Sequence, residues 1–265
     1  MLVDTHAHLD FPELAHELPS VMSRAAQNGV REIVTIGISV DSSQRAVDLA
    51  KAHERIYATV GVHPHGAFDL DQETRDGLIA LAGHTKVVAI GEIGLDYYRD
   101  RQPRELQKRC MCQQLEIAQQ MDLPVVFHIR EAYSDFLEII EEYIGNLRGV
   151  VLHCFSGDWK VAKQCLHLGC YLSVPGTVTF PRAEIQQEVV KLAPPERLLL
   201  ETDAPFLAPA PYRGKVNEPS YILYTAHKVA ELLNWPIEEV GAQATQNAHK
   251  VFKMKCRDGA ARDDG

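Results

Sequence analysis

The sequence predicts an α/β fold, a (β/α)8 barrel of the TIM type. Short apolar runs rich in β-branched residues alternate with amphipathic segments along the chain, which gives a strand-then-helix unit eight times. Strict alternation of this kind requires a parallel sheet, and eight units close most readily into a barrel. The length of 265 residues, 46% of them hydrophobic, suits one large core.

The eight apolar runs are the expected strands. In chain order they are Leu2 to His8, Glu32 to Ile38, Ile56 to His63, Val87 to Ile93, Pro124 to Ile129, Gly149 to Phe155, Cys170 to Val174 and Leu198 to Asp203. Each run ends after a few residues, far short of the roughly 20 apolar residues that a membrane span requires. We therefore expect a soluble protein without membrane association.

The amphipathic segments between the runs are the expected helices. They are Leu14 to Asn28, Ser42 to Glu54, Gln72 to Ala82, Pro103 to Met121, Glu131 to Ile144, Trp159 to Leu168 and Glu184 to Leu192. A loop rich in Pro and Gly, Pro205 to Pro219, follows the last strand and is long enough to cover a site. Two further helices, Ser220 to Leu233 and Ile237 to Phe252, complete a single domain over residues 1–256. We expect residues 257–265 to be a disordered polar tail.

Composition restricts the class of protein. A net charge of −9 argues against a broad basic surface that coats nucleic acid, but it leaves room for an enzyme that holds one phosphate through metal ions. The first residues already read as a strand and lack the pattern of a secretory signal. The six cysteines lie mostly inside predicted elements, and a core of this size needs no disulfides. These features predict a cytoplasmic protein, and nothing indicates a stable protein partner.

Polar side chains gather at the carboxyl ends of the predicted strands. They are His6 and His8 on the first strand, His63 on the third, Glu92 on the fourth, His128 on the fifth, His153 on the sixth, and Glu201 and Asp203 on the eighth. In a β/α barrel these ends converge on one mouth, where the active sites of this fold lie. Because side chains alternate along a strand, the two histidines of the first strand share one face. We expect all these groups to meet in one pocket.

This set of side chains predicts a metal site. A lone histidine that ends an apolar run is usually a structural residue. Several buried imidazoles and carboxylates without partners would instead cost on the order of several kcal/mol, and cations satisfy them most directly. Imidazole with carboxylate and no thiolate suits a catalytic zinc, manganese, iron or magnesium ion. Four histidines and two carboxylates of this set are too many ligands for one tetrahedral ion, but they suit two ions bridged by a carboxylate, and Glu92 is the natural bridge.

The ordered motifs resemble those of the TatD family of metal-dependent deoxyribonucleases. They are DTHAHLD at Asp4 to Asp10, GVHPH at Gly61 to His65, IGEIGLDYY at Ile90 to Tyr98, VVFHIREA at Val125 to Ala132, LHCFSG at Leu152 to Gly157, and LLLETDAPFLAP at Leu198 to Pro209. Weaker agreement at Tyr212 to Ser220 and Thr245 to Phe252 extends the resemblance over almost the whole chain. No single motif decides the resemblance, but the ordered set is highly specific.

The resemblance implies an amidohydrolase-like barrel with a one- or two-metal centre and a nuclease activity. The implied ligands are His6, His8, Glu92, His128, His153 and Asp203. We expect two divalent ions, magnesium, zinc or manganese, and hydrolysis of phosphodiester bonds. The expected activity is that of a 3′-5′ exodeoxyribonuclease that acts on DNA ends or short single strands, with RNA as a further candidate substrate.

The mechanism that fits these residues uses water activated by the metal ions. One ion would lie on His6, His8 and Asp203 and the other on His128 and His153, with the bridging Glu92 between them. The ions would lower the pKa of water toward about 7. Asp203 would then accept the proton, and Glu201 is a candidate relay.

Other residues at the mouth are candidates for binding the substrate. His63 could bind the phosphate or protonate the leaving oxygen, or it could form a structural hydrogen bond in the GVHP turn. Arg130 could pair with a phosphate oxygen, or it could form a salt bridge with an acid such as Glu131 or Asp135. His65 is a further candidate. Tyr97 or its neighbour Tyr98 could stack on a terminal base, with at least one of the two in the core.

Two further features leave alternatives open. A basic run, Arg99, Arg101, Arg104, Lys108 and Arg109, could guide a strand to the mouth or form a solvated helix face. Cys154 should point away from its neighbour His153 and into the core. The competing functions are an amidohydrolase and a phosphotriesterase or lactonase that acts on a small molecule. Dinuclear amidohydrolase sites often use a carboxylated lysine as the bridge, and no lysine ends a predicted strand here.

Overall fold

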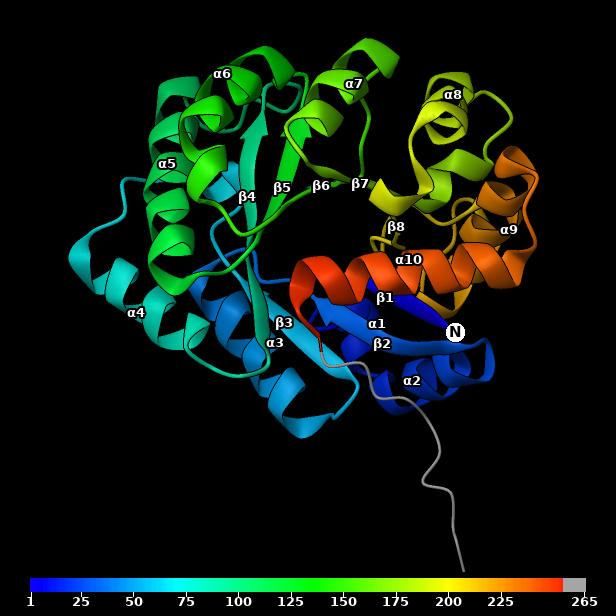
Figure 1. The fold of residues 1–265 in the computed structure, drawn as a ribbon. Coiled ribbons are helices and arrows are strands. Elements are labelled where there is room, and N and C mark those ends of the chain that lie inside the picture. Colours follow the sequence, from blue (N-terminus) through cyan, green and yellow to red (C-terminus); the bar gives the residue numbers. More distant parts are fainter. Residues whose placement is uncertain (255–265) are drawn as a thin grey trace, which may run out of the picture.

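The computed structural model describes residues 1–254 and confirms the predicted barrel. Eight parallel strands follow one another around the sheet in sequence order, with helices arranged outside them (Figure 1). The strands are β1 (Leu2–Ala7), β2 (Val30–Thr35), β3 (Ile56–Val60), β4 (Val87–Asp96), β5 (Val125–Arg130), β6 (Val150–His153), β7 (Tyr171–Val174) and β8 (Leu198–Leu200). The expected tail at residues 257–265 lies outside the described residues.

The ring closes where the chain after β8 returns to β1. Ala7 and Ala204 form a parallel bridge, and the backbone N–H of Asp203 donates to the carbonyl oxygen of His6 at 2.9 Å. The buried carboxylate of Asp4 accepts hydrogen bonds from the backbone N–H and the hydroxyl of Thr202, at 3.0 and 2.6 Å. These bonds hold the segment after β8 against β1, so the polar residues of both segments lie close together.

The core has two parts. One lies between the strands and the surrounding helices and includes Phe127 and Phe136, whose rings meet edge to face at 5.1 Å. The other contains inward-facing strand residues such as Val126 and Val151, and helix α10 (Ile237–Phe252) contributes Phe252 to it. Since α10 also contacts β1 and β8, it closes the amino-terminal end of the barrel and leaves the carboxyl-terminal mouth for the polar residues.

The helices follow the predicted order. They are α1 (Pro12–Ala15), α2 (Leu18–Gln27), α3 (Val40–Ala52), α4 (Gln72–Ala82), α5 (Arg104–Met121), α6 (Tyr133–Tyr143), α7 (Trp159–His167), α8 (Glu184–Leu192), α9 (Ile222–Leu233) and α10 (Ile237–Phe252). The single helix expected over Leu14 to Asn28 was wrong. Glu17 leaves the helical region at φ −121° and ψ 22°, and Pro19 sits in the first turn of α2, where its missing N–H costs nothing.

Strand β4 is longer than expected and brings a further acid to the mouth. The sequence predicted its end at Ile93, but the strand continues to Asp96. Gly94 makes this possible, because at φ +139° its backbone lies so close to β5 that a Cβ atom would overlap the carbonyl oxygen of His128. Strands β3 and β8 are shorter than expected, so His63 and Asp203 lie just beyond strand ends.

Within residues 1–254, no helix combines the length and the apolar character that a membrane crossing needs. The five cysteines of this part of the chain carry free thiols.

Candidate metal centre

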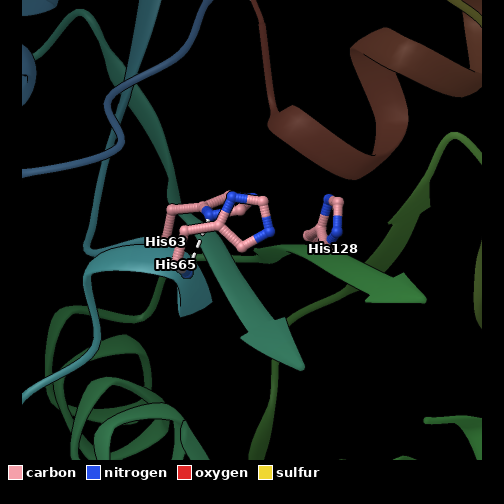
Figure 2. A group of neighbouring side chains, drawn as sticks. All are labelled: His63, His65 and His128. Carbon is pink, nitrogen blue, oxygen red and sulfur yellow. Dashed lines mark hydrogen bonds between the residues drawn. The ribbon is translucent and has the colours of Figure 1, made fainter. Parts of the chain in front are cut away.

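Three histidines meet where β3 and β5 end (Figure 2). Nitrogen atoms of His63, His65 and His128 lie within 4.8 Å of one another. The Nδ1 atom of His63 accepts a hydrogen bond from the backbone N–H of His65 at 3.1 Å. His65 donates in turn from Nε2 to Oδ2 of Asp96 at 2.7 Å. Side chains and backbone of the protein therefore already satisfy His63 Nδ1 and His65 Nε2.

Asp96 is a buried residue of the site that the sequence analysis missed. Its Oδ2 atom accepts from His65 and from Nε2 of His128, the latter at 3.1 Å, and its Oδ1 atom accepts from the backbone N–H of Arg99 at 2.8 Å. Burial raises the pKa of Asp96, but these hydrogen bonds outweigh it and hold the pKa well below its usual value. The sequence feature that could have identified Asp96 is its spacing of four residues from Glu92, because this spacing places both acids on one face of an extended strand.

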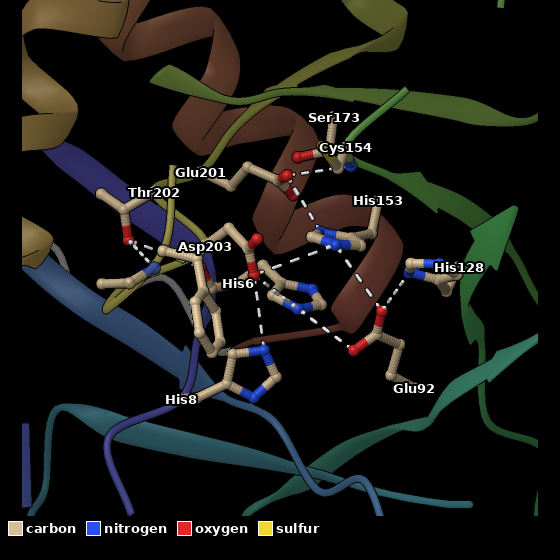
Figure 3. Close-up of polar contacts among 12 residues, drawn as sticks. His6, His8, Glu92, His128, His153, Cys154, Ser173, Glu201, Thr202 and Asp203 are labelled. Carbon is tan, nitrogen blue, oxygen red and sulfur yellow. Dashed lines mark hydrogen bonds and ion pairs between the residues drawn. The ribbon is translucent and has the colours of Figure 1, made fainter. Parts of the chain in front are cut away.

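Glu92 contacts histidines from three other strands at the mouth (Figure 3). Its Oε1 atom is 3.0 Å from Nδ1 of His128 and 3.6 Å from Nε2 of His153, and its Oε2 atom is 3.5 Å from Nε2 of His6. Strands β4, β5, β6 and β1 thus each contribute a side chain. One carboxylate reaches histidines on both sides of the pocket, as a bridging ligand must.

Asp203 joins the histidines of β1 from the other side. Its Oδ1 atom is 3.4 Å from Nε2 of His8, 3.7 Å from Nε2 of His6 and 3.9 Å from Nε2 of His153. Ligand atoms of His6, His8 and Asp203 lie within 4.8 Å of one another, and so do those of Glu92, His128 and His153. The structure therefore brings all six predicted ligands together in two groups of three.

Unsatisfied buried atoms test whether this set fits metal ions. The side chain of His6 is fully buried, and neither of its ring nitrogens has a hydrogen-bond partner in the described chain. Its ring stacks on that of His153 with centroids 3.4 Å apart. Burial of unpaired imidazole nitrogens is costly, and imidazole with carboxylate is the ligand chemistry of divalent cations at catalytic sites. The residues present fit such cations.

The charges in the pocket favour ionised carboxylates. Burial raises the pKa of Glu92, but the surrounding histidines, His63 and His153 first among them, outweigh burial and bring this pKa well below its usual value. The pKa of Asp203 is also lowered, because a hydrogen bond from His8 and nearby imidazoles outweigh its burial. Both acids are therefore charged at neutral pH and available as ligands.

Glu201 supports His153 from behind. The Oε1 atom of the fully buried Glu201 lies 2.9 Å from Nδ1 of His153 and accepts the backbone N–H of Cys154 at 2.9 Å. Burial lowers the pKa of His153, but the charges of Glu201 and Glu92 outweigh it and raise this pKa to about 10. A carboxylate behind a histidine ligand fixes the direction in which the ring points. Asp96 stands in the same relation to His128.

His63 forms the structural hydrogen bond considered from the sequence and also faces the pocket. Its Nδ1 atom takes part in the GVHP turn, while its Nε2 atom lies 3.6 Å from Oε1 of Glu92. Burial lowers the pKa of His63 to about 3, although nearby Glu92 opposes the shift. The ring is therefore neutral, and because Nδ1 accepts a hydrogen bond, Nε2 carries the proton. His63 presents an N–H donor to the pocket.

Arg130 and Tyr98 form a stacked pair at one side of the mouth. The guanidinium of Arg130 lies 3.9 Å from the ring centroid of Tyr98, whose exposed fraction is 53%. Within residues 1–254, Arg130 forms no ion pair, so the alternative salt bridge to Glu131 or Asp135 is not formed. The partly buried Tyr97 donates its hydroxyl to Asp135 at 2.7 Å. Of the two tyrosines, Tyr98 is the more exposed to solvent.

Most of the basic run is neutralised by neighbouring acids. Arg104 pairs with Asp100 at 3.4 Å, Lys108 with Asp135 at 2.7 Å, and Arg109 with Asp69 at 2.9 Å. Arg99 and Arg101 form no ion pair with any described residue. The part of the run that can attract a phosphate is thus its beginning, next to Tyr98.

Left-handed backbone conformations end several strands at the mouth. Glu131, Cys154 and Asp203 follow β5, β6 and β8 with φ values of +53°, +45° and +58°. Non-glycine residues rarely adopt this region, and they concentrate at functional sites. The turn places the partly exposed Cys154 beside Glu201 (Figure 3). The expectation that Cys154 is a core residue was wrong, because β6 ends at His153 and not at the predicted Phe155, which leaves Cys154 in the turn.

Comparisons with known proteins cover nearly the whole chain. The sequence profile of the family described as "TatD related DNase" matches residues 3–253. A metal-dependent hydrolase named YabD from Bacillus subtilis is 41% identical over 254 residues, which are 96% of this chain and 100% of that protein. The protein named "3'-5' ssDNA/RNA exonuclease TatD" from Salmonella typhimurium is 32% identical over 258 residues, which are 96% of this chain and 99% of that protein. The crystal structure of YJJV, a TatD homologue from Escherichia coli, superposes with a TM-score of 0.90 at 31% identity and covers 96% of this chain and 98% of that one.

Proposed function

The chain belongs to the family of TatD-related DNases, which are metal-dependent hydrolases, and from this premise we propose that it removes nucleotides from the 3′ end of single-stranded DNA or RNA. The relative named as a 3′-5′ exonuclease supports the direction and the single-stranded substrate. We further propose that two divalent cations, magnesium, zinc or manganese, bind at the mouth. The physiological substrates would be DNA ends and short single strands, acted on in the cytoplasm.

The observation that carries this proposal is the buried histidine and carboxylate cluster around Glu92. His6, His8 and Asp203 would hold one cation, His128 and His153 the other, and Glu92 would contact both. Bound cations supply Lewis-acid stabilisation of the phosphoryl oxygens and lower the pKa of water toward about 7. The protein contributes the fixed ligand positions, because Glu201 and Asp96 hold His153 and His128 from behind.

Three residues of the chain are suited to moving or placing protons. Asp203 is ionised and its side chain is partly exposed, so it can accept a proton from the attacking water. Glu201 contacts His153 rather than solvent, so its proposed role is to relay charge through that ring. His63 offers its Nε2–H to a phosphoryl or leaving oxygen from within 3.6 Å of Glu92. As a neutral ring, it acts as a hydrogen-bond donor.

The proposed substrate-binding residues lie at or just beyond the ends of β3, β4 and β5. Arg130 has its guanidinium free of any acid in the described chain and can pair with a phosphate that approaches the cluster. His65 adds an imidazole edge beside Asp96 and His128. Tyr97 remains a candidate for stacking, although its hydroxyl already donates to Asp135. Tyr98, with its exposed ring, is the stronger candidate.

End-labelled substrates test the proposal directly. Single- and double-stranded DNA and RNA, labelled at either end, would be incubated with each cation and with a chelator. A 5′-labelled single strand should shorten stepwise, a 3′ label should appear at once in mononucleotides, and closed circular DNA should survive. Chelation should abolish the activity and a divalent cation should restore it, because the residues suggest no metal-free nucleophile.

Matched variants link the activity to the cluster. Glu92→Gln should lower turnover by on the order of a hundredfold or more, since an amide cannot join two cations as a carboxylate does. Glu116→Gln, the same change at an exposed residue of α5 that pairs with Arg75, should leave it unchanged. Circles nicked as fast as linear strands would overturn the exonuclease assignment. Hydrolysis of a cyclic amide or lactone, with no nucleic acid cut under any condition, would establish the small-molecule alternative.

A further inference from the structure

An exposed aromatic ring stands next to one of the proposed ligands. Phe206 is 46% exposed, and its ring centroid lies 5.9 Å from that of His8. The half-buried Phe11 completes the group, with its ring 5.0 Å from His8 and perpendicular to Phe206 at 5.6 Å. Large apolar side chains that remain in water beside a polar site call for an explanation.

The exposure of Phe206 does not result from a loose loop. The backbone N–H of Phe206 donates to the carbonyl oxygen of Asp203 at 2.8 Å. The fully buried Asn217 donates from Nδ2 to the carbonyl oxygens of Phe206 and Thr202 at 2.6 and 2.8 Å. A side chain that satisfies two carbonyl oxygens fixes the backbone on both sides of Asp203. The ring is therefore held outward from a rigid support.

Leu207, the residue after Phe206, has an unfavourable backbone conformation that the surrounding contacts maintain. Leu207 has a φ of +53°, in the left-handed region that branched and bulky residues rarely occupy. The loop is also pinned on its far side, because a Cβ atom on Gly176 would come within 2.8 Å of the carbonyl oxygen of Leu207. Strain of this kind persists where surrounding contacts impose it, and it concentrates at ligand clamps.

We propose that Phe206, with Phe11 at its edge, is a stacking platform for the nucleobase next to the scissile phosphate. This inference rests on the proposed function and names a part of its substrate site. An aromatic face stacks on any base, so the platform selects nucleic acid without selecting sequence. Its place beside His8 puts the base within one nucleotide of a phosphate at the metal cluster.

The platform also accounts for a preference for unpaired ends. Stacking on Phe206 requires an open base face, which a base inside a duplex does not present. Tyr98 with Arg130 is attached to the β4 and β5 side of the cluster, whereas Phe206 follows β8. Together they would hold bases on either side of the phosphate, and only a single strand offers two unstacked neighbours.

Steady-state kinetics of Phe206 variants test the proposed contact between this ring and a nucleobase. For Phe206→Ala we expect KM for a short single strand to rise about 10- to 100-fold, with a smaller change in kcat. Phe206→Trp should restore KM because it restores the aromatic face. Phe68→Ala is the matched control, since Phe68 is also an exposed phenylalanine, at 40%, and has no ring contact with a histidine in the described residues.

Oligonucleotides that carry one abasic residue make the test specific. Moved along the strand, the abasic residue should raise KM of the wild type at one position, and at that position Phe206→Ala should cause no further loss. Equal losses on the intact and abasic strands would overturn the proposal, as would an unchanged KM. Saturation-transfer NMR with adenosine monophosphate reports the same contact without turnover. It would still show base binding lost in Phe206→Ala if the nuclease assignment failed, and binding that persists would refute the platform.

Discussion

Replacement of Asp96 by asparagine should weaken one of the two proposed metal sites and spare the other. Asp96 is completely buried and accepts N–H groups from His128, His65 and the backbone of Arg99. Its bond to Nε2 of His128 leaves Nδ1 of that ring directed toward Glu92, at 3.0 Å. The amide of asparagine carries no charge and has one acceptor oxygen for three donors, so this ring orientation loses its support.

The expected loss follows from the role of such supporting groups. Removal of a hydrogen-bond partner behind a metal ligand typically lowers metal affinity about 10- to 100-fold, which corresponds to about 1.4 to 2.8 kcal/mol. Isothermal titration calorimetry with zinc or manganese should therefore show one weakened and one unchanged site. The bulk of the protein should stay folded, because the two side chains are nearly isosteric.

A matched variant separates this effect from a general loss of charge. Asp135→Asn makes the same change at a carboxylate that bonds Tyr97 and Lys108 outside the cluster, and it should leave both affinities unchanged. Unchanged binding in Asp96→Asn would refute the proposed support of His128. Equal weakening of both sites would instead show that Asp96 acts on the cluster as a whole.

Three further predictions concern the pH dependence of stabilisation by metal, the binding of oligonucleotides and the stability of the core. Since nearby carboxylates raise the pKa of His153 to about 10, protonation of this ring stabilises the metal-free fold fully below about pH 6.5, and the stabilisation is lost as the pH rises toward 10. The increase in Tm on adding metal should therefore grow from pH 6.5 to 9 in differential scanning fluorimetry, and a constant increase would contradict this. Charge reversal at Arg99 and Arg101, which no described acid neutralises, should raise KM for oligonucleotides and weaken its salt dependence more than it lowers kcat, whereas a fall in kcat alone would place them at the reacting phosphate. Phe127→Ala should lower the free energy of unfolding in urea by about 3 to 5 kcal/mol, because a fully buried ring leaves a cavity, and a loss below about 1 kcal/mol would show that the core refills it.

Much of the architecture could be predicted from local pattern. Apolar runs alternate with amphipathic segments, and this alternation alone requires parallel strands with helices outside them. The polar residues that close the runs, such as His6, Glu92 and His153, had to meet once the strands formed a ring, because the carboxyl ends of all strands share one mouth. The candidate ligand set was therefore readable from positions far apart in the sequence.

Two kinds of residue could not be placed from the sequence: those that support the proposed ligands and those whose rings are exposed at the mouth. Their positions depend on contacts between elements that meet only in the folded chain. Asp96 reaches the site only because Gly94 allows β4 to continue against β5, a requirement of the neighbouring strand and not of the β4 sequence. The exposure of Tyr98 rather than Tyr97 follows from the partner that each side chain finds on another element. In the same way, Phe206 is presented because the distant Asn217 fixes its backbone. Periodicity indicates which face of a segment is buried, whereas the direction in which a loop side chain points is decided by hydrogen bonds between segments that meet only in the folded chain.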